Sequence, residues 1–201
     1  MKVKKRMAKK LVTTRKDATV ADAINLMKKH SIRHLPVVED GELLGWVTER
    51  DIREAYIASL IEQVSIGDIM IKDPITISSD ANLEEAAELL YRHGIGGLPV
   101  VDKGKLVGVI TVADIMAAFI EVMGILQESS RIDVILGGKP HAFENVTKII
   151  RDHGSEIISV GMSAQQDRTR RIYYLRLTKC DVHALAKEIE KAGYKVASMT
   201  E

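Results

Sequence analysis

The sequence predicts a mixed α/β (α+β) protein built from two pseudo-symmetric β-α-β-β-α repeats and a C-terminal β-α-β-β-α-β domain. Two observations lead to this prediction. Residues 7–52 return without a gap as residues 70–115, and an internal repeat of this kind fixes the architecture. Beyond residue 130 the repeat stops and a different succession of apolar segments begins. Because the chain holds only two copies, we expect a pair packed face to face and not a solenoid.

Each repeat is expected to open with a short extended stretch, at residues 11–13 and 75–77. A helix follows, because apolar residues recur with the period of one helix face: in the first copy they are Val20, Ala23, Ile24 and Met27. Two capping boxes predict where these helices begin: Thr19 with Asp22, and Asn82 with Glu85.

Two apolar runs follow the helix in each copy, at residues 35–38 and 43–48 in the first. Gly41 lies between them and supplies the positive φ that a short hairpin needs. A second helix is predicted to begin after Thr48 and, in the other copy, after Thr111.

The last helix of the second repeat should extend to about Leu126. Polar residues 127–130 follow it and predict a linker. The sequence thus predicts two repeats and one further domain, at residues 1–63, 64–126 and 131–201.

The C-terminal domain is predicted from the order of its apolar segments. Strands are expected at residues 132–136, 157–162, 172–177 and 194–199. The first helix should turn four residues inward: Phe143, Val146, Ile149 and Ile150. Asp181 should cap the second helix, which Gly193 ends. The resulting order is the ferredoxin-like split βαβ arrangement.

Composition and charge narrow the class of protein. Hydrophobic residues make up 46% of the 201 residues and charged residues 28%, which is ordinary for a soluble globular protein. The net charge of +1 argues against a general nucleic-acid or membrane surface. Lys and Arg are concentrated in the first ten residues. Because no aromatic residues are interleaved there, we favour a solvated end over a nucleic-acid-binding arm.

Cys180 is the only cysteine, so no intramolecular disulfide can form and a reducing, cytoplasmic setting is expected. No apolar run approaches the ~18–20 residues of a membrane span. No apolar segment follows the basic start either, so a secretory signal is not expected.

A Thr-x-x-Asp motif occurs at the same place in both repeats: Thr48 with Asp51, and Thr111 with Asp114. One interpretation is structural, because such a motif is a helix capping box worth about 0.5–2 kcal/mol. The other is a binding site. A helix N-terminus with a Thr hydroxyl suits a phosphate, and a carboxylate matches the two hydroxyls of a ribose. The spacing does not decide between them. Two nearby glycines would let a ligand approach the strand: Gly45 and Gly108.

The two copies differ where the third apolar segment begins. The first has Arg33 and His34 at this place, and the second has Gly96 and Gly97. Arg33 could fork onto a phosphate and His34 could contact it. Alternatively, both are exposed residues at a strand edge. If a nucleotide binds, we expect two unequal sites.

No metal site or catalytic residue is predicted. His30 and His93 recur at helix ends, where a cationic side chain complements the helix dipole, and we favour this role over metal binding. The other histidines lack metal-ligand spacing, and Cys180 lacks a CxxC partner. The sequence contains no nucleophile elbow, no Walker loop and no G-x-G-x-x-G behind a strand. We therefore expect a protein that is not an enzyme.

The repeat resembles a tandem pair of cystathionine-β-synthase (CBS) domains. The resemblance covers about residues 1–126 and rests on the Leu-Pro-Val-Val run, the Gly-x-Leu-x-Gly that follows it and the Thr-x-x-Asp motif, all present in both copies. It implies a pseudo-twofold pair with two clefts for adenosine-containing ligands: AMP, ADP, ATP or S-adenosylmethionine. Such a ligand would be regulatory, with Mg²⁺ as a further candidate beside its phosphates and no other cofactor required.

In such pairs the Asp holds ribose and the Thr meets phosphate, with basic residues on the phosphate side. Gly96 and Gly97 depart from that basic pattern, which argues against phosphate binding by the second copy. The resemblance implies the following nucleotide-binding residues: Thr13, Thr14, Ile32, Arg33, His34, Pro36, Thr48, Asp51, Thr76, Ile77, Ile95, Gly96, Gly97, Pro99, Thr111 and Asp114.

Residues 131–201 resemble an ACT domain, a small amino-acid-sensing β-α-β-β-α-β module. The resemblance rests mostly on the order of the elements, and the Asp-x-Pro-Gly type of signature is missing. It implies an effector loop at Gly137, Gly138 and Lys139. A CBS pair followed by an ACT domain is similar to the acetoin-utilisation AcuB-like regulators.

Three functional hypotheses follow. The first is a cytoplasmic regulator that senses an adenosine ligand, with the ACT-like domain for homodimerisation or amino-acid sensing and an unidentified protein as its target. The second is a structural scaffold with empty clefts. The third is a nucleotide hydrolase with Asp51 or Asp114 as base, although no second base, metal triad or nucleophile accompanies them. We favour the first.

Overall fold

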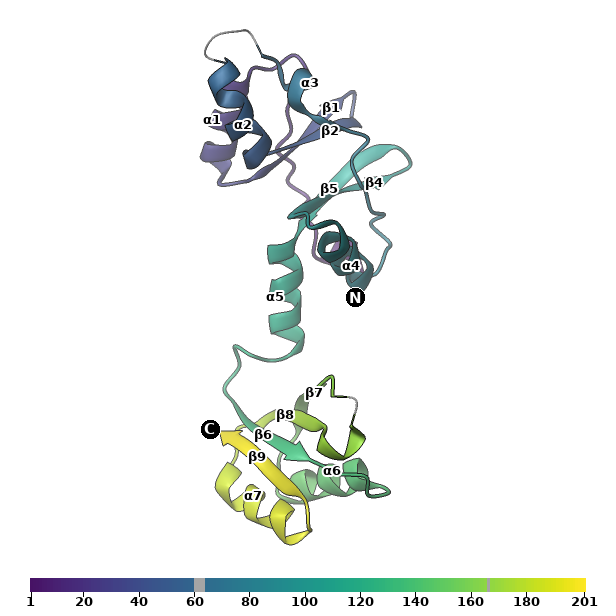
Figure 1. Ribbon diagram of the computed structural model, residues 1–201, viewed down its shortest axis with the longest axis vertical. Helices are drawn as coiled ribbons and strands as arrows, with labels where there is room; N and C mark the ends of the chain where they lie inside the picture. Colours follow the sequence, from purple (N-terminus) through teal and green to yellow (C-terminus); the bar gives the residue numbers. More distant parts are fainter. Residues whose placement is uncertain (60–63, 166) are drawn as a thin grey trace. The chain divides into compact units, whose positions relative to one another are not determined.

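The computed structural model describes residues 1–59, 64–165 and 167–201 and forms two compact units, residues 1–116 and 117–201 (Figure 1). Each unit is described by itself. The division falls inside helix α5 (Val112–Val122). The predicted boundary between the two repeats, at residues 63 and 64, touches a segment outside the described residues.

The first unit contains a sheet to which each repeat contributes one antiparallel hairpin. Its order is β1-β2-β5-β4, with β3 pairing to β2, and its strands are β1 (His34–Glu39), β2 (Glu42–Thr48), β3 (Ile71–Lys72), β4 (Gly97–Asp102) and β5 (Lys105–Thr111). His34 pairs with Thr48 as Gly97 pairs with Thr111, so the two hairpins have the same register. Gly41 has the predicted positive φ, 84°.

Helices pack against these hairpins in the predicted order: α1 (Val20–His30), α2 (Glu49–Ser59), α3 (Ile66–Ile69), α4 (Leu83–His93) and α5. The capping box of Thr19 with Asp22 is confirmed at the start of α1. The box predicted at Asn82 is wrong, since its side chain makes no cap hydrogen bond. The chain's first residues reach this helix instead, and the Leu83 N–H donates to the Met1 carbonyl oxygen at 2.8 Å.

The predicted opening strands are reduced to one bridged residue in each repeat. Thr14 pairs with Val37, and Ile77 pairs with Val100, both in parallel. Thr14 receives a hydrogen bond on its carbonyl oxygen from Val38 N–H at 2.9 Å and donates its own N–H to Pro36 at 3.0 Å. A register shift between Val37 and Val38 bends the neighbouring strand, so the pairing extends no further.

The segment that precedes each repeat packs on the other repeat. The short helix η1 (Val3–Lys5) lies on the second repeat, where Val3 N–H donates to Ala81 at 3.0 Å. Helix α3 lies on the first repeat, where Ile66 N–H donates to Ala18 at 2.8 Å. Val3 and Ile66 are both 0% exposed. Each folded half therefore borrows a stretch of chain from its neighbour in sequence.

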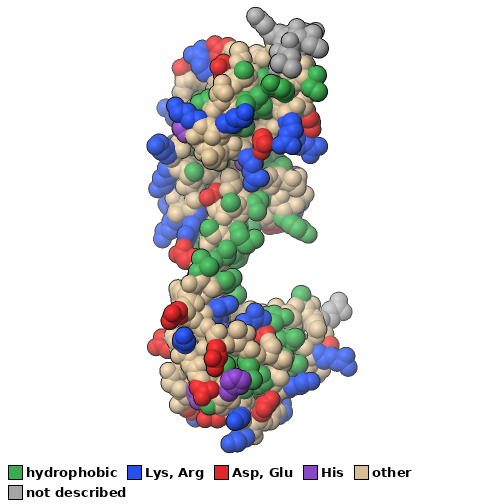
Figure 2. Space-filling model, turned by 90° about the vertical axis from the view of Figure 1, so that its left-hand side faces the viewer, with side chains coloured by type: hydrophobic (Ala, Val, Ile, Leu, Met, Phe, Trp, Pro, Cys, Tyr) green, Lys and Arg blue, Asp and Glu red, His purple; other side chains and the backbone are tan. Residues whose placement is uncertain are grey.

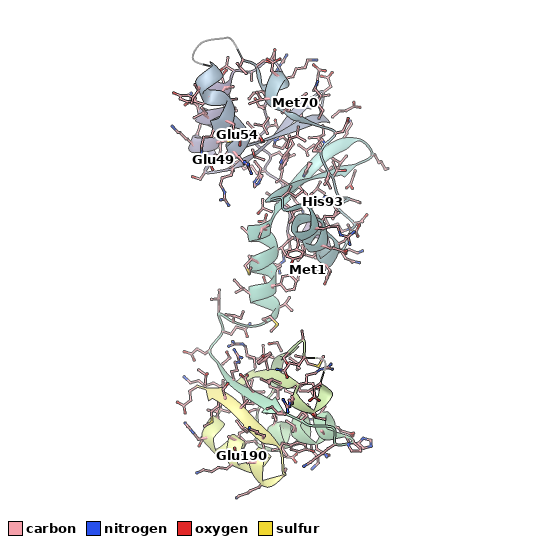
Figure 3. All side chains as sticks on the ribbon, in the orientation of Figure 1. Met1, Glu49, Glu54, Met70, His93 and Glu190 are labelled. Carbon is pink, nitrogen blue, oxygen red and sulfur yellow. The ribbon has the colours of Figure 1, made fainter. Side chains whose placement is uncertain are left out.

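This exchange accounts for two glycines that the sequence suggested would admit a ligand. A Cβ at Gly45 would lie 2.6 Å from Met70 Sδ and 3.0 Å from the Ile71 carbonyl oxygen. A Cβ at Gly108 would collide in the same way with Met7. Met70 belongs to the segment that follows α3 (Figure 3). The space beside these glycines thus holds a methionine, and the ligand interpretation of the glycines is wrong.

The second unit is a four-stranded antiparallel sheet with two helices. Its sheet order is β7-β8-β6-β9, and its elements are β6 (Ser129–Ile135), α6 (Ala142–Asp152), β7 (Ile157–Met162), β8 (Ile172–Thr178), α7 (Val182–Lys191) and β9 (Lys195–Thr200). Alternate residues of the central strands join the helices in one core, among them Ile132, Val134 and Leu175. Asp181 caps α7 as predicted, by accepting from Ala184 N–H at 3.0 Å.

Two details of the predicted second unit are wrong. Phe143 is 43% exposed, because Ala142, Val146 and Ile150 form the buried face of α6. The predicted linker at residues 127–130 is shorter, since β6 already begins at Ser129. Ser130 is buried and its hydroxyl receives the Cys180 N–H at 3.0 Å, so this polar residue serves the core.

Candidate functional site

Two clefts of the first unit are related by the internal repeat. The first cleft has a volume of about 480 Å³ and is lined by Arg33, His34, Trp46, Thr48, Glu49, Arg50, Ile71, Pro74, Ile75, Gly94, Ile95, Gly96, Gly97 and Pro99. The second cleft has a volume of about 360 Å³ and is lined by Ala8, Lys10, Leu11, Val12, Ser31, Ile32, Arg33, His34, Gly96, Val109, Thr111, Val112, Ala113 and Asp114.

Each cleft combines a Thr-x-x-Asp corner from one repeat with side chains from the other. The first cleft joins Thr48 to Ile95 and the paired glycines. The second cleft joins Thr111 and Asp114 to Ile32 and the Arg33-His34 pair. The sequence suggested that the basic pair serves its own copy, whereas the structure places it in the cleft of the other copy as well.

Several predicted residues lie off these clefts. Thr14, Pro36 and Ile77 are buried in the strand pairing and line neither cleft within the described chain. Thr13, Asp51 and Thr76 are likewise absent from both linings in the described parts. The extended segments do form cleft walls, but through earlier residues: Leu11 and Val12 in one cleft, Pro74 and Ile75 in the other.

The sequence did not indicate Lys10, Trp46 or Arg50 as site residues. Lys10 lies in the basic start of the chain, and only the packing of that start against the second repeat brings it to a cleft. Trp46 and Arg50 flank Thr48, on the last turn of β2 and the first turn of α2. Their nearness to the motif was the available signal.

The Thr-x-x-Asp corners form capping boxes, as the structural interpretation predicted. Asp51 Oδ2 accepts from the Thr48 N–H at 2.8 Å and from its hydroxyl at 2.7 Å. In the second repeat, Asp114 Oδ2 accepts from the Thr111 N–H at 2.8 Å and from its hydroxyl at 2.6 Å. Within the described residues no hydrogen bond engages the Oδ1 atom of either carboxylate. One oxygen of each half-buried Asp can therefore accept from a ligand while the helix stays capped.

Gly96 and Gly97 make room for His34. A Cβ at Gly96 would lie 2.9 Å from His34 Nε2, and one at Gly97 would lie 3.3 Å from the imidazole ring. The other side of the ring stacks on Trp46, with centroids 5.6 Å apart and planes at 29°. The difference between the two copies is thus complementary, because a bulky residue from one repeat fills the space left by glycines in the other.

The position of His34 affects its charge. Burial lowers the pKa of His34 below its ordinary value of 6.5, the Arg33 charge lowers it further, and Asp51 opposes both. The imidazole is therefore uncharged at neutral pH, and Arg33 supplies the permanent positive charge of the pair.

We expect the free energy of unfolding to fall as the pH drops from about 6.5 toward 5. In that range the unfolded chain binds a proton at His34 that the folded chain still excludes, so acid favours unfolding. The substitution His34→Gln should flatten this pH dependence. Urea unfolding followed by circular dichroism at several pH values measures the effect, and an equal slope in both proteins would contradict it.

The described residues show neither a metal centre nor a membrane segment. No group of three or more His, Cys, Asp or Glu side chains there is arranged to hold a metal ion. None of the described helices has the length and apolar character to cross a bilayer.

With the clefts defined, comparison with known proteins gives the class. The CBS domain family matches residues 3–58 and 66–121, so the chain belongs to the CBS domain family. It is a tandem CBS pair with an additional C-terminal unit.

Relatives share the CBS pair in different contexts. A CBS domain-containing protein from Dictyostelium discoideum is 35% identical over 60% of this chain and 92% of its own length. Inosine-5'-monophosphate dehydrogenase from Methanocaldococcus jannaschii is 34% identical over 71% of this chain. The match spans only 28% of that dehydrogenase and corresponds to its CBS module.

Solved structures of similar pairs contain adenosine ligands. The CBS domain pair of protein MJ0100, in complex with 5'-methylthioadenosine and S-adenosyl-L-methionine, is 31% identical with a TM-score of 0.55, over 59% of this chain and 99% of that one. CBSX2 from Arabidopsis thaliana, in complex with AMP, is 29% identical with a TM-score of 0.56, over 60% and 97%. A protein described as an acetoin utilization protein (AcuB), from Vibrio cholerae, is 35% identical with a TM-score of 0.59, over 64% and 98%.

Proposed function

We propose that this chain is a non-catalytic regulator that senses an adenosine nucleotide or derivative in its CBS clefts. One observation carries the proposal: each cleft places a Thr-x-x-Asp corner opposite an apolar wall and a cationic pair. Adenosine ligands in similar CBS pairs support it. Candidate ligands are AMP, ADP, ATP and S-adenosylmethionine, with Mg²⁺ beside the phosphates of the larger nucleotides.

In this proposal the residues of the second cleft divide the ligand between them. Asp114 Oδ1 accepts from the ribose hydroxyls, and the N-terminus of α5 with Thr111 faces the phosphate. Leu11, Val12 and Ile32 provide an apolar wall for the adenine base. In the first cleft, Pro74, Ile75 and Ile95 take the place of that wall.

For the second unit we propose an ACT-type module of ferredoxin-like fold that dimerises or binds an amino acid. Its β-α-β-β-α-β order and antiparallel sheet support this. The loop at Gly137 and Gly138 is the proposed effector loop. Lys139 there donates to the Gly193 carbonyl oxygen at 2.7 Å and lies 5.1 Å from the centre of the Tyr194 ring, so an effector would have to join or replace these contacts.

Regulation needs a surface through which a ligand is felt by another protein. Hydrophobic side chains reach the surface along α5 (Figure 2), namely Val112, Met116, Phe119 and Val122. We propose this surface for contact with a second copy or with the target protein. The lone Cys180 supports a cytoplasmic setting for such a complex.

Thermal unfolding with AMP, ADP, ATP, S-adenosylmethionine and single amino acids tests the proposed function. A ligand present at about 100 times its dissociation constant should add about 2.7 kcal/mol to the free energy of unfolding. An adenosine compound is expected to raise the melting temperature. If no compound shifts it, in protein shown to be ligand-free, the sensor proposal fails and the scaffold alternative takes its place.

A further inference from the structure

The two clefts share one cationic pair. Arg33 and His34 line both clefts, and so does Gly96. The sharing follows from the packing, because the His34 ring lies against the backbone of Gly96 and Gly97. The residues that the repeat would offer as a second basic pair are these same glycines, so no second Arg-His pair exists for the other cleft.

Further charges make the clefts unequal. Lys10 lines the second cleft and forms no ion pair with the residues described. Its counterpart in the other repeat is Asp73. The first cleft has Arg50 in place of a free lysine, but Arg50 Nε pairs with Glu54 on α2 at 3.0 Å (Figure 3), and Glu49 lies in the same lining. An anion therefore finds more available positive charge in the second cleft.

We propose that the shared Arg33 couples the two clefts, so that one phosphate-bearing adenosine ligand binds tightly per chain, in the second cleft, and weakens a second such ligand in the first. This inference rests on the proposed function. Once the guanidinium turns toward a phosphate in one cleft, the other cleft loses its cation and faces a nearby negative charge. An adenosine ligand without a phosphate makes no demand on Arg33 and fills both clefts.

Titration calorimetry of the full chain with AMP and with adenosine tests this coupling, since the two probes differ only in the phosphate. For AMP we expect a second binding step at least about tenfold weaker than the first. For adenosine we expect two sites of similar affinity. Arg33→Ala should weaken the first AMP step and bring the two steps together. Arg92→Ala removes an equal charge from the outer face of α4, where Arg92 pairs with Glu88, and should change neither ligand's binding.

Each other outcome is decisive. Two equal AMP sites would overturn the coupling while leaving the proposed function intact. One adenosine per chain, or no adenosine beside one AMP, would also overturn it, because charge would then not set the number of sites. An unchanged ratio of AMP steps in Arg33→Ala would show that Arg33 does not carry the coupling. If neither probe binds, nor any other adenosine compound, the proposed function itself fails.

Discussion

Replacing Ile66 with alanine is expected to lower the free energy of unfolding of the first unit by about 2–5 kcal/mol. Ile66 is 0% exposed and belongs to the same core cluster as Val20, Leu35 and Val47. Its position in the sequence assigns it to the second repeat, yet it fills the core of the first. The loss should therefore appear where the repeat alignment alone would not place it.

Urea unfolding followed by tryptophan fluorescence measures this loss, because Trp46 is the only tryptophan and is buried in the first repeat. The matched control is Ile57→Ala on α2, where the same atoms are removed from a side chain that is 71% exposed. That control should change stability by less than about 0.5 kcal/mol. Equal effects in the two variants would contradict the exchange of segments between the repeats.

The second large effect concerns Asp114. Replacing it with alanine should weaken AMP binding by about 10- to 150-fold, because a hydrogen bond to a charged group contributes about 1.5–3 kcal/mol. The variant also loses its helix cap, so it should be less stable by about 0.5–2 kcal/mol. Calorimetry measures the affinity and thermal unfolding measures the stability.

The capping box of α1 provides a control with the same chemistry. Asp22 Oδ2 accepts from the Thr19 hydroxyl at 2.7 Å and from its N–H at 3.2 Å, outside both clefts. Asp22→Ala should cost comparable stability and leave AMP affinity unchanged. If Asp22→Ala and Asp114→Ala weaken AMP binding equally, loss of folded protein would explain both, and Asp114 would not be a ligand contact.

The local architecture of the repeats was predictable because each signal acts over a short distance. Gly41 specifies a tight turn, Thr19 specifies a helix start, and the alternating apolar runs specify the hairpins. Asn82 shows the limit of such reasoning. Its box is absent because Met1, far away in sequence, reaches the helix first. A local motif cannot reveal a distant competitor for the same N–H group.

The clefts were predictable in kind but not in composition. The Thr-x-x-Asp motif marked the two corners, yet a repeat alignment compares residue 33 with residue 96 and does not say that they meet. Lys10 was likewise recorded only as part of a basic end. Its place in a cleft depends on the exchange that carries the first residues of the chain onto the second repeat.

The most direct test of the account compares AMP binding to the wild-type chain with binding to the double variant Asp51→Ala/Asp114→Ala, measured by titration calorimetry on folded protein. The account predicts saturable binding by the wild type and a loss of at least about tenfold in affinity in the double variant. Binding of AMP or another adenosine compound by the double variant with wild-type affinity would contradict the assignment of the two clefts as adenosine sites.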